Sequence, residues 1–237
     1  MTSVHVGLPT LRGPLAQYAE SFDLLEVRPV DTPLPRGTRL RAWRKEVPPS
    51  FVFSVVLPAS VALLKPSPEA DAALAEALAA AEALEARCLV LVTPPAVTPT
   101  ELNRKRLKAL TERLPRDAVT LSWEPRGIWD NAEAAVWARD LDVHLVVDAA
   151  REAAPRGALL YTRLRGIGVA DRLGDEAIER VRDALRGRRE AFVLVESSGA
   201  KRIAQALRKP LGGSPRAITS SVAMRPPITL SAEDEEQ

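Results

Sequence analysis

Eight short apolar runs recur along the chain, and polar segments with helix signals separate most of them. The runs are rich in β-branched and other apolar residues and do not alternate strictly between apolar and polar positions. This pattern is typical of strands that are buried on both faces of a parallel sheet. The predicted strands lie at residues 4–7, 22–27, 51–57, 88–92, 118–124, 143–147, 158–164 and 191–196.

The segments between the runs predict helices. Ser67-Pro68-Glu69 supplies an N-cap, a first-turn proline and an early acidic residue, and an apolar stripe follows it from Leu74 to Leu84. Residues 98–101 form a capping-box pattern, and Asp130 with Glu133 forms an acidic version of it. Further helices are predicted at 14–20, 36–46, 175–187 and 197–209, whereas the element between residues 148 and 156 is short.

Strands alternating with helices in a chain of this length favour a single α/β domain, a (β/α)8 TIM-type barrel over residues 1–209. An open, doubly wound sheet is the competing interpretation. The segment "GLPTLRGP" after the first run lacks the glycine spacing of dinucleotide-binding and P-loop motifs. Residues 210–237 lose periodicity, gain Pro, Gly and Ser, and end in an acidic segment, so we predict an extended tail, disordered from Ser231.

Composition narrows the classes of function only slightly. The net charge is +2, and residues 231–237 hold four of the 31 acidic residues, so the rest of the chain carries 33 − 27 = +6. Such a charge attracts an anionic ligand but is well below that of a typical nucleic-acid-binding domain. The single cysteine, Cys88, lies inside an apolar run, which predicts a buried side chain and excludes an intramolecular disulfide. Without a signal sequence or a membrane-length apolar run, we expect a cytoplasmic protein with no membrane partner.

Charged side chains gather where the predicted strands end. In a barrel of this type the functional groups lie at the carboxyl ends of the strands, the mouth of the barrel. Because side chains alternate along a strand, Tyr161, Arg163 and Arg165 share one face, which we expect to point inward, while Leu160 and Leu164 pack beneath the helices. The candidate ligand site comprises Glu26, Arg28, Glu124, Arg126, Asp148, Tyr161, Arg163, Arg165 and Glu196. The alternative is a purely structural network of arginine–carboxylate pairs that closes the barrel.

The order and spacing of several motifs resemble the domain of unknown function 72 family over residues 4–208. The motifs are "LLEV", "FVFSVVLPAS", "VTPP", "WEPRGIW", "LVVDAA" and "LLYTRLRG". The resemblance implies an irregular TIM-type barrel. The residues of this chain that match motif positions of the family are Glu26, Glu124, Arg126, Trp129, Asp148, Tyr161, Arg163 and Gly166. The chain departs from the family's pattern in having Val56 for a lysine, Arg165 for a histidine and Ser197-Ser198 for an asparagine pair. Any family chemistry that needs that lysine or histidine is therefore not expected here.

Several site chemistries remain open. The candidate catalytic residues of a hydrolase or a phosphoesterase-like enzyme are Glu26, Glu124 and Asp148, with Glu26 or Glu124 as the acid/base group and Asp148 orienting the arginines. Together with Glu196 they are also candidate oxygen ligands for Mg²⁺ or Mn²⁺. The two histidines, His5 and His144, lie early in their runs, so a histidine-rich zinc site is not expected.

A phosphate site is the further prediction, because barrels of this type often hold phosphate near the last two strands. It would be formed by Arg163, Arg165, Ser197, Ser198, Gly199 and Lys201, and the alternative for Ser197 is that it only caps the last helix. Trp129 is the candidate for stacking on a sugar or base. The expected ligand is a small anionic or phosphorylated molecule. The alternatives are a non-catalytic binding or regulatory barrel and a nucleic-acid-processing or metal-dependent phosphoesterase.

Overall fold

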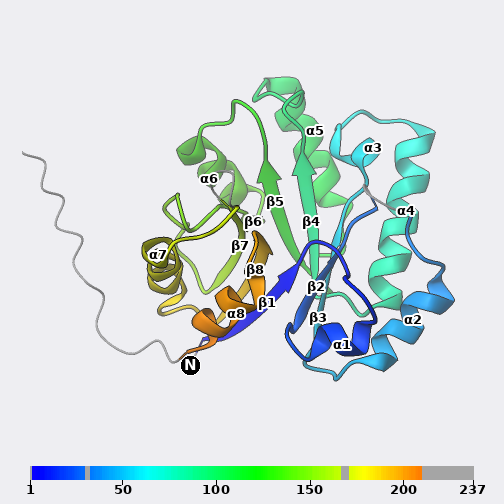
Figure 1. Cartoon of the computed structure of the whole chain (residues 1–237). Helices are drawn as coiled ribbons and strands as arrows, with labels where there is room; N and C mark the ends of the chain where they lie inside the picture. The colour runs from blue at the N-terminus through cyan, green and yellow to red at the C-terminus, as the bar shows by residue number, and fades with distance from the viewer. Residues whose placement is uncertain (1, 30–32, 167–170, 210–237) are drawn as a thin grey trace, which may run out of the picture.

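The computed structural model describes residues 2–29, 33–166 and 171–209, which form a (β/α)8 barrel (Figure 1). Eight parallel strands line the barrel: β1 Ser3–Leu8, β2 Leu24–Val27, β3 Val52–Val56, β4 Cys88–Thr93, β5 Thr120–Pro125, β6 His144–Leu145, β7 Leu159–Arg165 and β8 Glu190–Glu196. Eight helices follow or separate them: α1 Leu15–Ala19, α2 Gly37–Glu46, α3 Ala59–Ala62, α4 Pro68–Ala83, α5 Glu101–Glu112, α6 Asn131–Asp140, α7 Asp175–Leu185 and α8 Ala200–Arg208.

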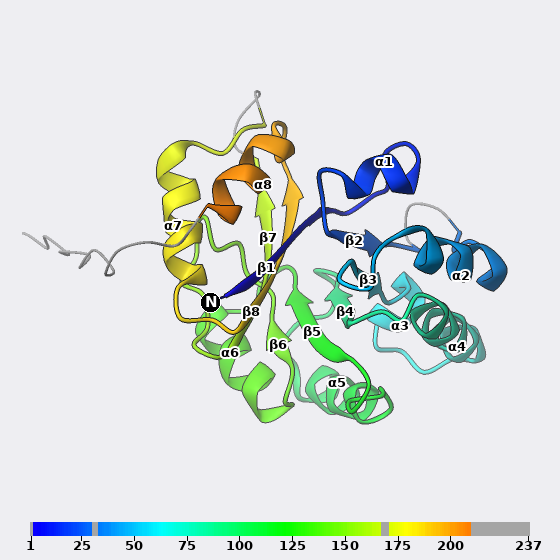
Figure 2. The ribbon, with the colours of Figure 1, turned by 90° about the horizontal axis from the view of Figure 1, so that it is seen from below.

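The strands are hydrogen-bonded in the order β6-β5-β4-β3-β2-β1-β8-β7, and the helices surround them when the barrel is seen from below (Figure 2). The ring closes between β6 and β7 through a single parallel bridge from Val147 to Thr162. At this seam the hydroxyl of Thr162 donates to the carbonyl oxygen of Val147 at 2.8 Å and accepts from the backbone N–H of Ala149 at 3.0 Å. A threonine hydroxyl therefore supplements the ladder where β6 is too short to provide one.

Alternate residues of each strand pack into two separate cores. Leu24, Val52, Val90, Tyr161 and Phe192 belong to a cluster inside the barrel. The residues one position away along the strands, including Leu25, Phe53, Leu89, Leu160 and Val193, pack with the helices in a second cluster. The predicted alternation is confirmed, and the side chains of Glu26 and Arg163 consequently share the inward parity of Leu24 and Tyr161.

Local capping explains where several helices begin. The side chain of Ser67 accepts from the N–H of Ala70 at 3.1 Å at the start of α4, and Asp130 accepts from the first turn of α6. The predicted capping box at 98–101 was placed two residues early, because the N-cap of α5 is Thr100. Its hydroxyl accepts from the N–H of Asn103, which satisfies one of the unpaired donors of the first turn.

The barrel is irregular on two sides. Residues 148–158, between β6 and β7, contain turns but no helix, whereas β3 and β4 are joined by both α3 and α4. At Gly7 of β1 a Cβ would lie 1.8 Å from the carbonyl oxygen of Leu24, so only glycine allows β1 and β2 to pair here.

No helix within the described residues is both long and apolar enough to cross a lipid bilayer. The predicted tail, residues 210–237, lies outside the described residues.

Candidate functional site

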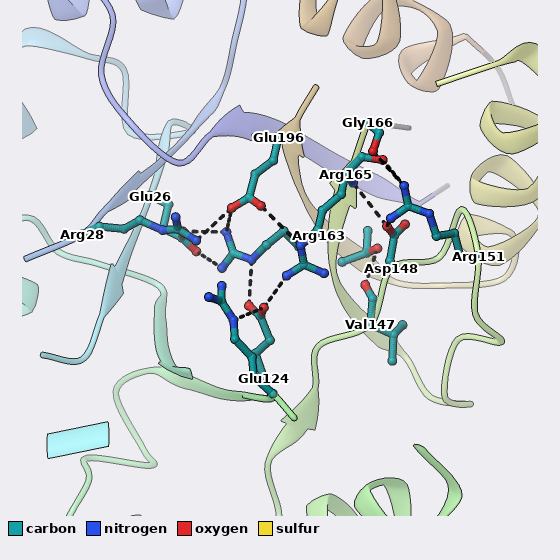
Figure 3. Close-up of polar contacts among 12 residues, drawn as sticks. Glu26, Arg28, Glu124, Val147, Asp148, Arg151, Arg163, Arg165, Gly166 and Glu196 are labelled. Atoms are coloured by element: carbon teal, nitrogen blue, oxygen red, sulfur yellow. Dashed lines mark hydrogen bonds and ion pairs between the residues drawn. The ribbon is translucent and has the colours of Figure 1, made fainter. Parts of the chain in front are cut away.

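Arg163 of β7 is the centre of a network of charges at the mouth of the barrel (Figure 3). Its Nη1 and Nη2 donate to the two carboxylate oxygens of Glu26 from β2 at 2.8 and 2.9 Å, a bidentate pair. Its Nε donates to Glu124 from β5 at 2.7 Å, and its Nη1 also contacts Glu196 from β8 at 3.0 Å. One fully buried guanidinium thus joins the ends of four strands.

Two hydroxyl groups extend this network into the barrel. The hydroxyl of Tyr161 donates to Glu26 at 2.7 Å and lies 2.9 Å from the hydroxyl of Ser54 on β3. Because the single phenolic proton is directed at the carboxylate, Ser54 is the donor to Tyr161. Burial, and then the charge of Glu26, raises the pKa of Tyr161 well above its ordinary value, so the phenol stays protonated. We call Ser54, Glu26, Glu124, Tyr161 and Arg163 the buried cluster.

The two carboxyl groups of the buried cluster are ionised. Burial alone would raise the pKa of Glu26, but the charge and hydrogen bonds of Arg163 outweigh it and hold the pKa below its ordinary value. The pKa of Glu124 is also lowered, because Arg163, Arg126 and Arg165 together outweigh the effect of burial. Neither group therefore carries a proton to donate at neutral pH.

Three further arginines lie above the buried cluster, and we call Arg28, Arg126 and Arg165 the rim arginines. Arg28 bridges Glu26 at 2.6 Å and Glu196 at 2.9 Å. Arg165 contacts Glu124 at 2.5 Å and Glu196 at 3.5 Å, and Arg126 contacts Glu124 at 3.2 Å through its Nε. Four guanidinium groups, including that of Arg163, face three carboxylates, so the network has one excess positive charge.

A cavity of about 680 Å³ lies over this network. Its lining includes Thr10, Arg28, Arg126, Asn131, Arg165 and Glu196. The side chain of Arg126 is 44% exposed, and among the described residues its two terminal nitrogens have no hydrogen-bond partner. The loop that follows lies close to the end of β4. At Gly127, where φ is +91°, a Cβ would lie 2.8 Å from Pro95, so the close approach requires glycine. The cavity therefore presents unused guanidinium donors from a fixed loop.

Asp148 lies beside the network but has other partners. It accepts from Nη1 of Arg151 at 2.7 Å and from the backbone N–H groups of Ala150 and Arg165. Arg151 in turn donates to the carbonyl oxygens of Arg165 and Gly166. This pair ties the helix-free turn after β6 to the end of β7 (Figure 3). Sequence reasoning did not single out Arg151, although its spacing of three residues from Asp148 was a usable signal.

Eight of the predicted site residues meet in one connected network, and five others do not join it. The eight are Glu26, Arg28, Glu124, Arg126, Tyr161, Arg163, Arg165 and Glu196. Ser54 is the member that sequence reasoning missed, and its inward parity on β3 with Val52 was the signal that could have identified it.

The serine donors of the predicted phosphate site at the last two strands already have partners, so that site stays a prediction. The hydroxyls of Ser197 and Ser198 and the N–H of Ser198 all donate to the carbonyl oxygen of Asp171, so they hold that loop. Ser197 does not cap α8 either, since the N-cap is Gly199 with φ of +75°. Lys201 lines a different cavity, next to α1.

Trp129 is a core residue and does not lie at the rim as predicted. Its indole is 7% exposed, donates to the carbonyl oxygen of Val97 at 2.7 Å and packs edge-on against Trp123. The ring is therefore not available to stack on a ligand. The indole lies in the core because the loop after β5 folds back toward the end of β4.

The donor set does not fit a divalent metal ion. Among the residues that the structure describes, no three His, Cys, Asp or Glu side chains gather as metal ligands would. Both oxygens of Glu26 and both oxygens of Glu124 already accept hydrogen bonds from arginine or tyrosine. An ion would have to displace those arginines, so the Mg²⁺ or Mn²⁺ site considered from the sequence remains only a prediction.

The fold and the polar mouth place the chain among the TIM-type barrels. It belongs to the family described as "Protein of unknown function DUF72", whose model matches residues 6–226. A DUF72 family protein from Enterococcus faecalis V583 shares 18% identity with a TM-score of 0.71, over 88% of this chain and 97% of that one.

Two other solved structures extend the comparison. A DUF72 family protein from Thermotoga maritima MSB8 is 18% identical with a TM-score of 0.66, over 86% of this chain and 96% of that one. An AP endonuclease of family 2 from Brucella melitensis is 15% identical with a TM-score of 0.59, over 88% and 97%. At these identities the likeness establishes the fold alone. No functionally curated protein matches the chain in sequence.

Proposed function

We propose that the barrel binds a small ligand bearing a carboxylate or phosphate group in the cavity at its mouth. The observation that carries this proposal is the excess of guanidinium donors: four arginines face three carboxylates, and the unused N–H groups of Arg126 border a cavity of about 680 Å³. Arginine suits this role because its planar set of donors matches the oxygens of carboxylate and phosphate groups.

The fixed position of the rim arginines supports binding without rearrangement. Each rim arginine is anchored by at least one carboxylate: Arg28 by Glu26 and Glu196, Arg126 by Glu124, and Arg165 by Glu124 and Glu196. An anchored side chain loses little conformational freedom when it contacts a ligand, so less of the interaction energy is spent on ordering it. The carboxylates therefore act in this proposal as supports for the arginines.

A binding role fits the site better than hydrolysis does. A general acid needs a pKa near the working pH, whereas the pKa values of Glu26 and Glu124 are both lowered by arginine neighbours. The solved barrels of similar fold include an AP endonuclease and an L-ribulose 3-epimerase, at 15% identity each. Their names suggest sugar or nucleic-acid chemistry, but here the candidate catalytic carboxylates are already paired with arginines.

Calorimetric titration of inorganic phosphate and of acetate tests the proposal. Wild type should bind at least one of the two anions, and Arg126→Ala should weaken that binding about tenfold or more, as expected for losing a charge-assisted contact. Arg113→Ala is the matched control, because Arg113 is similarly exposed and paired with Asp71 on the outside of the barrel. Equal binding by wild type and Arg126→Ala would contradict the proposal.

A further inference from the structure

A second cavity opens over the other half of the mouth, and its chemistry differs from that of the first. Its volume is about 360 Å³, and it lies over the carboxyl ends of β3 and β4. The residues that set its character are apolar: Val56, Leu57, Ala62, Leu63, Val92 and Pro95. One of these residues, Leu63, is 38% exposed and so presents apolar surface to solvent. An apolar recess therefore stands open beside the charged network.

The two cavities share two arginines. Arg28 and Arg126 line the polar cavity and the apolar cavity alike. The strand order explains the arrangement: β3 and β4 lie between β2 and β5, and these outer strands deliver Arg28 and Arg126 just beyond their ends. The apolar recess is therefore flanked on both sides by a guanidinium group, and each guanidinium is fixed by a glutamate, Glu26 or Glu124.

We propose that the ligand of this site is an amphiphilic anion, whose charged group contacts Arg28 and Arg126 while a short apolar group fills the recess over β3 and β4. This inference rests on the proposed function and specifies the class of ligand. Ligand sites are usually concave and largely apolar, with a few placed polar groups that fix the orientation of the ligand. The recess and the two arginines together satisfy that description, whereas the polar cavity alone lacks the apolar part.

The donors of Arg126 favour a ligand with one anionic end. Arg126 lines both cavities, and among the described residues its terminal nitrogens have no hydrogen-bond partner. A purely apolar ligand would leave those donors without a partner. A small, fully polar anion would leave the exposed parts of Leu63 and Val92 in contact with water, which forgoes the free energy of burying them. An anion with an apolar substituent satisfies both groups at once.

A series of n-alkyl phosphates tests the inference by calorimetry: inorganic phosphate, methyl phosphate, n-propyl phosphate and n-pentyl phosphate. Each methylene that enters the recess should tighten Kd about fourfold, equivalent to about 0.8 kcal/mol. In Ala59→Leu, which fills the recess from the exposed start of α3, affinity should no longer rise with chain length while inorganic phosphate binds as before. Ala79→Leu, at an exposed position of α4, is the matched control and should keep the chain-length dependence.

The possible results separate the two proposals. A chain-length dependence that is lost in Ala59→Leu and kept in Ala79→Leu supports the amphiphilic ligand. Binding of phosphate with no dependence on chain length overturns this inference and leaves the proposed function standing. Affinity that rises with chain length but is unchanged in Arg126→Ala also overturns it, because the charged group would then lie elsewhere. If neither phosphate nor any alkyl phosphate binds, while acetate does, the corresponding n-alkyl carboxylates take their place in the same test. If neither anion binds, both proposals fail.

Discussion

The buried cluster and the rim arginines both contain arginines paired with glutamates, but the pairs have different roles. Arg163 has no exposed side-chain surface, and all three of its guanidinium nitrogens donate to carboxylates. Arg126 is 44% exposed and uses only its Nε for a carboxylate, as far as the described residues show. Both arginines contact Glu124, so the chemistry of the partner does not distinguish them.

Burial decides between the two roles. A fully desolvated ion pair holds the ends of β-strands together. Removing either partner leaves the other charge buried in a medium that cannot solvate it, which is costly. A half-exposed arginine gains little stability from its carboxylate but remains able to bind a ligand. The comparison therefore predicts that substitutions in the buried cluster mainly reduce stability, and that substitutions of the rim arginines mainly reduce binding.

The largest effect should follow from Arg163→Met. The substitution leaves Glu26 and Glu124 buried and without their main partner, so the free energy of unfolding should fall by about 3–5 kcal/mol. Urea unfolding measures it, with Arg113→Ala as a surface control. The double variant Arg163→Met with Glu26→Gln should be less destabilised than the sum of the single variants, because one stranded charge is removed. A loss below about 1 kcal/mol in Arg163→Met would remove the distinction between the two regions.

Glu26→Gln should give the next largest loss in the free energy of unfolding, and the size of this loss should depend on pH. Its folded-state pKa is below the ordinary value of 4.5, so the ionised carboxylate stabilises the fold above that value and loses this contribution as pH falls. At neutral pH the variant should be about 2–3 kcal/mol less stable than wild type. The gap should narrow as pH is lowered below 4.5, because Glu26 is protonated first in the unfolded state and then also in the folded state. Glu101→Gln, an exposed glutamate on α5, is the control; a gap that widens on acidification would contradict the account.

Tyr161→Phe removes one hydroxyl from the buried cluster. Glu26 loses the 2.7 Å hydrogen bond and Ser54 loses its acceptor, but the ion pair with Arg163 remains. We expect a loss of about 1.5 kcal/mol in the free energy of unfolding, as for a hydrogen bond to a charged group. Thermal unfolding measures it. A change as large as that of Arg163→Met would mean that the hydroxyl pair, and not the guanidinium, supports the strand ends.

The smallest effect on stability should come from Arg126→Ala. Its contact with Glu124 is 3.2 Å long and half-exposed, and Arg163 and Arg165 continue to pair with that carboxylate. The free energy of unfolding should change by less than about 1 kcal/mol. Chemical unfolding in the absence of ligand measures this change. A much larger loss would make Arg126 part of the structural network.

Periodicity in the sequence was sufficient to predict the barrel and the direction of its polar side chains. The eight apolar runs coincide with the eight strands, and the parity of Tyr161, Arg163 and Arg165 placed them inside correctly. Period-two alternation is a local property of a strand, which is why the sequence alone could reveal it. The closure of the barrel at Val147 and Thr162 was not visible, because it consists of one isolated backbone bridge that a side-chain hydroxyl supplements.

The positions of loop side chains were predicted less well than those of strand side chains. A loop has no regular alternation of side-chain direction, so each side chain points where the local backbone directs it. Trp129 stands three residues from Arg126, yet the intervening Gly127 turns the chain so that the indole enters the core. Ser197 and Ser198 follow β8 directly, yet both donate to Asp171, a residue of another loop. The pairing of each carboxylate was equally hidden, since it depends on distances across the mouth.

Thermal unfolding of three proteins with and without phosphate tests the central claim most directly. Without ligand, Arg126→Ala should melt close to wild type, whereas Arg163→Met should melt many degrees lower. At phosphate concentrations about 100 times Kd, wild type should gain about 2.7 kcal/mol of stability, and Arg126→Ala should gain little. The account is contradicted if Arg126→Ala melts as low as Arg163→Met, or if it gains as much from phosphate as wild type does.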